Sequence, residues 1–120
     1  MSENTNPTAE ATTPGTTTVS PEVLVEIARL EALKVPGVYG MAPTPSGVSR
    51  LFRPGAGEGV CLRVEDNVVD VDLYIIVENG VNLRRVSREV QKAIARAISE
   101  MVGMVPGRIN VHIEDIHFER

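Results

Sequence analysis

The chain has 120 residues, 23% of them charged, and a formal net charge of −4 at pH 7. This length suits one domain, and the acidic balance argues against binding of polyanions through the overall charge. The single cysteine, Cys61, excludes an intrachain disulfide and is typical of a reducing compartment. No apolar run approaches the ~20 residues of a membrane span. Because the N-terminus also lacks the pattern of a signal peptide, we expect a cytoplasmic protein.

Residues 1–19 are rich in Thr, Pro, Asn and Glu and nearly lack large apolar side chains. Such a segment buries too little apolar surface to offset the entropy of ordering it. The sequence therefore predicts a disordered Thr/Pro-rich tail before the folded domain.

Ser20-Pro21-Glu22 is a good helix start, because it supplies a capping hydroxyl, a proline at the first helical position and an early carboxylate. The apolar face that follows is made by Val23, Ile27 and Leu30 and is widened by Leu24 and Leu33. We expect the helix to end near Lys34, because Pro36 disfavours helical geometry in the residue before it.

Gly37-Val38-Tyr39-Gly40 follows this helix and allows two interpretations. A Gly-x-x-Gly loop resembles the backbone clamp of KH RNA-binding domains. Here, however, its middle residues are not basic and prolines follow closely, so we favour a turn into a short strand. Residues 43–59 are rich in Gly, Pro and Ser and predict a long mobile loop, in which residues 49–53 fit one helical turn.

Three alternating segments predict strands that each have one apolar face. Residues 60–65 form the first, and the turn at Asp66-Asn67 joins it to residues 68–78 as a hairpin. Residues 108–114 form the last predicted strand, after Pro106-Gly107 has separated it from the preceding helix. Apolar residues change parity at 115–118, which indicates a bulge or the end of the sheet.

A long amphipathic helix is predicted between the second and third strands. Asn79-Gly80 is a strong turn pair, and the Asn82 side chain can cap the helix by accepting from a free backbone N–H. The apolar stripe consists of Val86, Val90, Ala93, Ile94, Ala97, Ile98 and Met101. Gly103 is placed to end the helix in a left-handed conformation.

The order of these elements predicts an α+β fold. A strand face and a helix stripe that are each apolar on one side must cover one another. We therefore expect a two-layer sandwich, with two helices packed on one face of a small, mostly antiparallel sheet. It forms a single domain over residues 20–118, and its other sheet face is largely open and polar.

Candidate catalytic groups gather on that open face. Asp70, Asp72, His112 and Glu114 come together there if their strands are neighbours, and two carboxylates with a histidine are suitable ligands for a divalent ion. Alternating charges are also the ordinary pattern of a solvated strand, and Cys61 has no histidine near it in sequence. We therefore favour a protein that is not an enzyme, with no catalytic residues, no metal and no cofactor.

Basic residues repeat every fourth position along the long helix, at Arg84, Arg88, Lys92 and Arg96. One exposed flank would carry them, where they can contact phosphates of nucleic acid, anionic lipid headgroups or an acidic protein. The alternative is a solvated helix face with basic residues toward the C-terminal end. Arg84 and Arg85 lie at the wrong end for that explanation, so the four residues are candidates for an interaction surface.

Apolar residues with the parity of the open face form the second candidate surface. Tyr74 and Ile76 have this parity, and Ile116 and Phe118 lie near them. An uncovered sheet face with such residues is a natural self-association surface. Asp72, Tyr74 and Ile76 are therefore predicted as interaction residues.

Several stretches resemble the alkaline-shock-protein family of bacterial envelope stress response proteins. They are residues 20–23 and 35–38 around the first helix, the run Val-Asp-Val-Asp-Leu-Tyr-Ile-Ile-Val-Glu-Asn-Gly-Val-Asn at 69–82, and Val111-His112-Ile113 leading to Ile116. The resemblance covers roughly residues 19–118. The run at 69–82 is fairly specific for the family, although it shows no chemistry.

The resemblance implies a cytoplasmic, non-enzymatic bacterial protein of cell-envelope homeostasis. Such a protein acts as a scaffold or interaction module, self-associates as an oligomer, and lies near the membrane through a small membrane-anchored protein partner, without inserting itself. The alternative is a KH-like RNA-binding module that uses the basic helix 82–102, although we regard nucleic acid as the less favoured partner.

Overall fold

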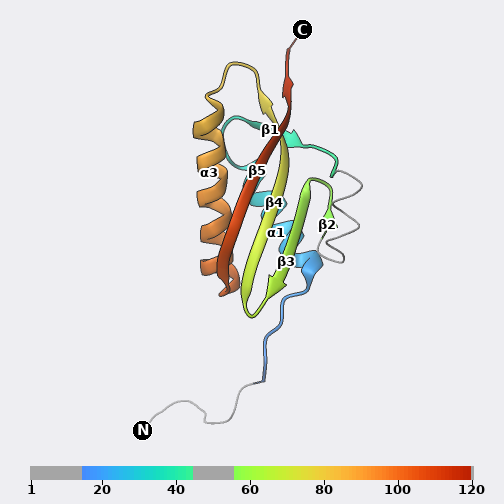
Figure 1. Cartoon of the computed structure of the whole chain (residues 1–120), viewed down its shortest axis with the longest axis vertical. Coiled ribbons are helices and arrows are strands. Elements are labelled where there is room, and N and C mark those ends of the chain that lie inside the picture. The colour runs from blue at the N-terminus through green and yellow to red at the C-terminus, as the bar shows by residue number, and fades with distance from the viewer. Residues whose placement is uncertain (1–14, 45–55, 120) are drawn as a thin grey trace.

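The computed structural model describes residues 15–44 and 56–119. In this part of the chain, helices α1 (Pro21–Leu33) and α3 (Leu83–Arg96) lie against one side of a five-stranded sheet (Figure 1). The predicted α+β fold is therefore confirmed. Residues 1–14 of the predicted tail over residues 1–19 lie outside the described residues, as do the predicted helical turn at 49–53 and most of the predicted mobile loop.

The central strand of the sheet is β4 (Val68–Glu78). One of its edges pairs antiparallel with both β3 (Val60–Glu65) and β1 (Val38–Met41), which lie end to end along it. Its other edge pairs in parallel with β5 (Val105–His117). The short strand β2 (Ala56–Gly57) pairs with β3, so the end of the predicted 43–59 loop belongs to the sheet.

The predicted turns and caps are confirmed. Asp66 and Asn67 have φ angles of 52° and 68°, the left-handed pair that a two-residue hairpin turn requires. The side chain of Ser20 accepts from the backbone N–H of Val23, and that of Asn82 accepts from the N–H of Arg85. These short polar side chains satisfy amides that have no partner inside the helix.

The long helix changes its winding at its end. Residues Ala97–Val102 (η2) form a π-helix, and Gly103, at φ 78°, terminates it as predicted. A π-helix bonds each residue to the fifth along rather than the fourth, so positions after Ala97 leave the α-helical spacing. Met101 was predicted in the apolar stripe but is 63% exposed, which makes that prediction wrong.

The main core lies between the sheet and the two helices. Every second residue of β4 is almost fully buried there, as the alternation predicted: Val69, Val71, Leu73, Ile75 and Val77. On α3 the buried residues Val86, Val90 and Ile94 lie in one stripe, again as predicted. The apolar spacing of both elements is therefore what holds the two layers together.

The buried face of α1 differs in part from the predicted one. Leu24 is buried as predicted, but Val23 and Leu30 are 48% and 45% exposed, and the other buried residues are Val25, Ala28 and Ala32. The smaller alanines allow α1 to approach the sheet closely, and this packing outweighs the larger apolar area of the other face.

The β5 strand carries the predicted irregularity. Ile75 pairs with Ile113 but Ile76 pairs with Asp115, so Glu114 is an extra residue on β5. This bulge turns Ile116 toward the main core, against which it packs. The expectation that Ile116 lies on or near the open face is therefore wrong.

Candidate functional site

The sheet face away from the helices carries a small second core. Cys61 is fully buried and Tyr74 is only 6% exposed, and together with Ala42 they form a cluster against which Ile76 packs. Tyr74 was predicted as an exposed residue of an open face, and that prediction is wrong. Ile76 is partly exposed, so it remains available at the margin of this cluster.

Residues 42–44 contribute to this burial. The backbone N–H of Ala42 donates to the carbonyl of Tyr74 at 2.8 Å, and the N–H of Gly59 donates to Thr44 Oγ1 at 2.8 Å. These bonds hold the segment after β1 alongside β4 and β3. Its side chains therefore cover part of a face that strand alternation alone marks as open.

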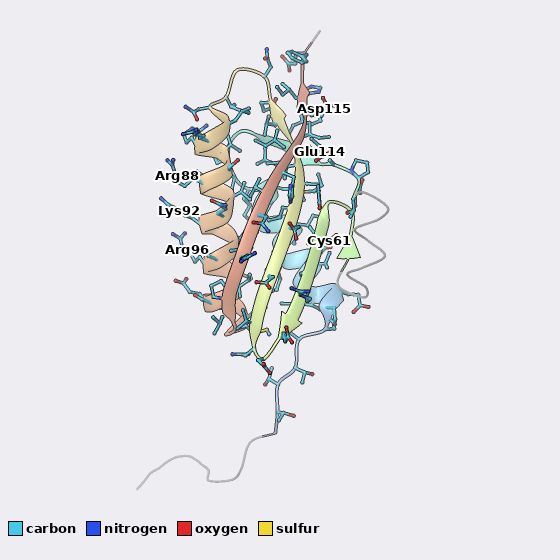
Figure 2. The ribbon with its side chains drawn as sticks, in the orientation of Figure 1. Cys61, Arg88, Lys92, Arg96, Glu114 and Asp115 are labelled. Atoms are coloured by element: carbon cyan, nitrogen blue, oxygen red, sulfur yellow. The ribbon has the colours of Figure 1, made fainter. Side chains whose placement is uncertain are left out.

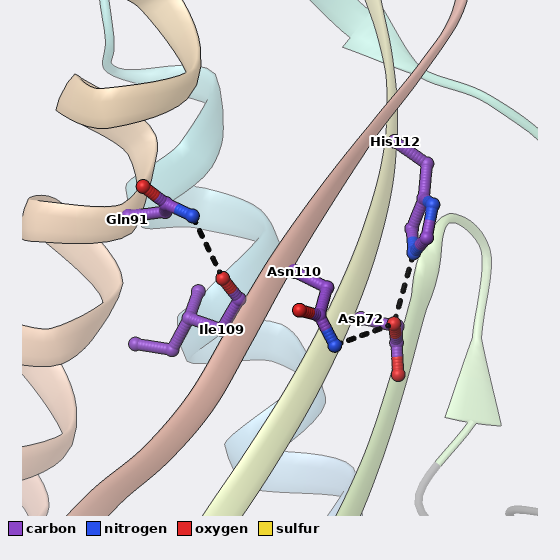
Figure 3. A network of polar contacts seen from close by, with 5 residues as sticks. All are labelled: Asp72, Gln91, Ile109, Asn110 and His112. Carbon is purple, nitrogen blue, oxygen red and sulfur yellow. Dashed lines mark hydrogen bonds and ion pairs between the residues drawn. The ribbon is translucent and has the colours of Figure 1, made fainter.

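A polar network occupies the neighbouring part of the same face, between β4 and β5 (Figure 3). Asp72 Oδ1 lies 2.9 Å from His112 Nε2 and accepts from Asn110 Nδ2 at 3.2 Å. The ring of His112 also stacks on Tyr74, with centroids 4.5 Å apart. The structure therefore brings together Asp72, Tyr74 and His112, as their common strand parity indicated.

Burial and the Asp72 carboxylate both affect the two buried titratable groups. Burial raises the pKa of the Cys61 thiol, and the negative charge of Asp72 raises it further, although a hydrogen bond with Thr44 opposes this. Burial, followed by the charge of Asp72, likewise raises the pKa of Tyr74. A protonated, inaccessible thiol is a poor nucleophile, so a catalytic role for Cys61 gains no support from its surroundings.

A shallow polar hollow of about 450 Å³ borders this network. Arg63 and Asp70 face one another across it at 4.0 Å, and Asp70 Oδ1 accepts from the backbone N–H of Arg108 at 2.8 Å. Within residues 15–44 and 56–119, no three His, Cys, Asp or Glu side chains are close enough to hold a metal ion. The possible metal set of Asp70, Asp72 and His112 therefore finds no support there.

The basic residues of α3 form the second candidate surface. Arg84, Arg88, Lys92 and Arg96 are all exposed, and we call them the basic ridge. Figure 2 shows Arg88, Lys92 and Arg96 pointing away from the body of the molecule, on the side of α3 remote from the sheet. The structure thus places the four predicted residues together, on the flank opposite the buried stripe of the same helix.

Sequence reasoning missed a contact that fixes α3 beside β5. Gln91 Nε2 donates to the backbone carbonyl of Ile109 at 2.9 Å (Figure 3). Gln91 lies between the buried stripe and the basic ridge. A polar amide side chain at that boundary could have indicated a hydrogen bond to the neighbouring strand. The contact joins α3 to β5, and the buried stripe of α3 sets the ridge on the flank that faces away from the sheet.

None of the described helices is long and apolar enough to cross a membrane.

Comparison with known proteins gives a consistent assignment. Residues 9–118 match the model of the alkaline-shock-protein family, which is described as having a cell envelope-related function. The chain is similar to the uncharacterized protein YqhY of Bacillus subtilis, at 31% identity over 88% of this chain and 79% of that protein. It is also similar to the uncharacterized protein Spy1535 of Streptococcus pyogenes, at 30% identity over 88% of this chain and 82% of that protein.

Among solved structures, the copper form of the MamM CTD is similar in fold. The TM-score is 0.51 at 16% sequence identity, and the match covers 82% of this chain and 89% of that one. At this identity the likeness concerns the arrangement of helices and strands alone.

Proposed function

Because this chain belongs to the alkaline-shock-protein family, whose function is cell envelope-related, we propose that it is a non-enzymatic interaction module that self-associates through the helix-free face of its sheet. Support comes from the uneven covering of the sheet, since α1 and α3 both pack on one side. Among the described residues, the other side keeps polar groups arranged by hydrogen bonds rather than a cleft with a nucleophile and a base.

The self-association surface is the part of that face around Asp72, Ile76 and His112. Ile76 is a partly exposed apolar residue beside a hydrogen-bonded acid and a histidine whose side chain is 41% exposed. An apolar residue rimmed by ordered polar groups is typical of a protein interface. A two-fold axis would set this patch against its own copy, as is usual for homodimers.

The variant Ile76→Lys tests this surface. Ile76 pairs with Asp115 on the adjacent strand, so the new ammonium group can pair with that carboxylate, which favours correct folding. In a symmetric interface, however, the new ammonium group would be buried opposite the same group of the partner copy, and the two positive charges would repel each other. Light scattering over a range of concentrations should show the wild type as an oligomer and the variant as a monomer.

The matched control is Val64→Lys. Val64 is 42% exposed and lies on β3, at the margin of the helix-covered side, so the same charge is added away from the proposed interface. This control should remain oligomeric. A wild type that stays monomeric at every concentration, or two variants that dissociate equally, would contradict the proposed surface.

The cellular setting is also part of the proposal. We expect the protein to be cytoplasmic and close to the membrane, where a small membrane-anchored protein recruits it, in agreement with the envelope-related description of the family. Pull-down from membrane and soluble fractions tests this, because recovery only with soluble proteins would refute recruitment.

A further inference from the structure

The basic ridge and its neighbour Arg85 concentrate positive charge on one helix. Five of the twelve Lys and Arg residues of the chain lie on α3: Arg84, Arg85, Arg88, Lys92 and Arg96. All five are exposed, and none forms an ion pair with another described residue. By contrast, Arg29 and Lys34, on or beside α1, each pair with a glutamate three residues away.

The N-terminal half of this arrangement works against the stability of the helix, although Glu89, four residues after Arg85 and three before Lys92, offsets part of the repulsion. Arg84 and Arg85 lie in the first turn, near the positive end of the helix dipole, and no acidic residue accompanies them there. Residues four apart on a helix are neighbours, so Arg88 also faces the like charges of Arg84 and Lys92. Because folding gains nothing from these repulsions, the ridge indicates a negatively charged partner outside the chain.

The shape of the ridge favours a broad anionic surface over a pocket ligand. At a rise of about 1.5 Å per residue, the ridge extends roughly 18 Å from Arg84 to Arg96. Figure 2 shows Arg88, Lys92 and Arg96 along the outer flank of α3. Long, flexible Lys and Arg side chains can all reach a flat plane from such a flank. No aromatic residue lies on α3, so the ridge lacks the stacking platforms with which proteins bind single-stranded nucleic acid.

From these observations we infer that the basic ridge of α3 binds the anionic headgroups of a lipid bilayer directly. The rest of the chain carries an excess of acidic residues, since the net charge is −4 despite the ridge. An anionic membrane therefore attracts this flank and repels the remainder, which fixes the orientation of the bound molecule. The inference rests on the envelope location in the proposed function and does not require self-association.

Co-sedimentation with vesicles tests the inference. The full chain should bind vesicles of phosphatidylglycerol mixed with phosphatidylcholine, should not bind pure phosphatidylcholine, and should be released by salt as the Debye length shrinks. Arg88→Glu replaces one attraction by one repulsion and should weaken partitioning about 30-fold. Arg88→Lys retains the charge and should bind as the wild type does.

The matched control is Lys34→Glu, which changes the net charge of the chain equally but on the exposed side chain next to α1. It should bind the mixed vesicles nearly as well as the wild type. Equal binding of wild type and Arg88→Glu, or equal loss with Lys34→Glu, would overturn the inference. It would also be overturned if Arg88→Glu abolished binding to a short RNA but left vesicle binding unchanged.

The two proposals fail separately. Suppose that the Ile76→Lys variant is monomeric, binds anionic vesicles, and loses this binding when Arg88→Glu is added. This result supports both the sheet interface and the lipid-binding ridge. Oligomers that ignore anionic vesicles overturn the ridge inference alone. Vesicle binding by a wild type that is monomeric at every concentration supports the ridge and overturns only the self-association surface.

Discussion

Arg88→Glu should make the folded protein more stable, although it removes a positive charge from the proposed binding surface. Arg88 is exposed on α3, with Arg84 and Lys92 four residues away on either side and Arg85 three residues before it. All three neighbours carry its own charge. A glutamate at this position converts three repulsive helix contacts into three attractive ones.

The size of the effect follows from the helix pairs. Each like-charge pair costs ~0.2–0.5 kcal/mol and each opposite pair gains a similar amount, so reversing three pairs gives at most roughly 3 kcal/mol. All four side chains are exposed, and solvent and salt screen such pairs strongly. We therefore expect a gain of about 1 kcal/mol in the free energy of unfolding, or a rise in Tm of about 4–8 °C for a domain of this size.

Thermal unfolding followed by circular dichroism measures this gain. The neutral variant Arg88→Gln removes the repulsion without adding attraction, so its Tm should lie between those of the wild type and Arg88→Glu. At high salt the three curves should converge, because the Debye length falls to about 3 Å at 1 M. If Arg88→Glu melted at or below the wild type at low salt, the reasoning about the ridge would be refuted.

Two further predictions concern the helix-free face of the sheet. Gly107→Ala should cost about 1–3 kcal/mol in urea unfolding, because its Cβ would lie 2.1 Å from Asp70 Oδ1 and 2.9 Å from Val68 Cγ1. The Asp70 carboxylate can move away only by giving up its hydrogen bond from the Arg108 N–H. The loss should be smaller in an Asp70→Ala background, where that oxygen is absent. Since burial and Asp72 raise the pKa of Cys61 in the folded protein, the stability that its neutral thiol contributes should decline as the pH rises from the ordinary thiol pKa through the raised one. Cys61→Ser should flatten this decline in pH-dependent denaturation.

Local patterns allowed much of the fold to be predicted. The strand β4 lies in the middle of the sheet and has one face against the helices, so its alternation reports directly on the core. The caps at Ser20 and Asn82 and the turn at Asp66-Asn67 depend on contacts only a few residues apart. These caps and this turn can therefore be predicted from the local sequence, without knowledge of the rest of the molecule.

The features that sequence reasoning missed depend on distant contacts. Residues 42–44 contribute to the burial of Tyr74 and Cys61, and they have no periodic pattern from which their place beside β4 could be predicted. The buried face of α1 is set by how closely its alanines approach the strands, whereas a ranking by hydrophobic size favours Val23 and Leu30. In both cases packing against another element outweighed the alternative that the local sequence favoured.

The two proposed surfaces lie on different sides of the molecule, and this separation has a thermodynamic consequence. Self-association through the helix-free face would bury the sheet in the middle of a dimer and leave α3 of each copy outside. Both basic ridges would then remain exposed, without any change of conformation. If they face the same bilayer, the second ridge binds intramolecularly and the dimer adheres more strongly than a monomer. In that arrangement the bilayer promotes dimerisation by the same factor, so dimer formation measured on anionic vesicles should exceed that in solution. A two-fold axis that sets the ridges on opposite sides of the dimer gives equal dimer formation in both conditions.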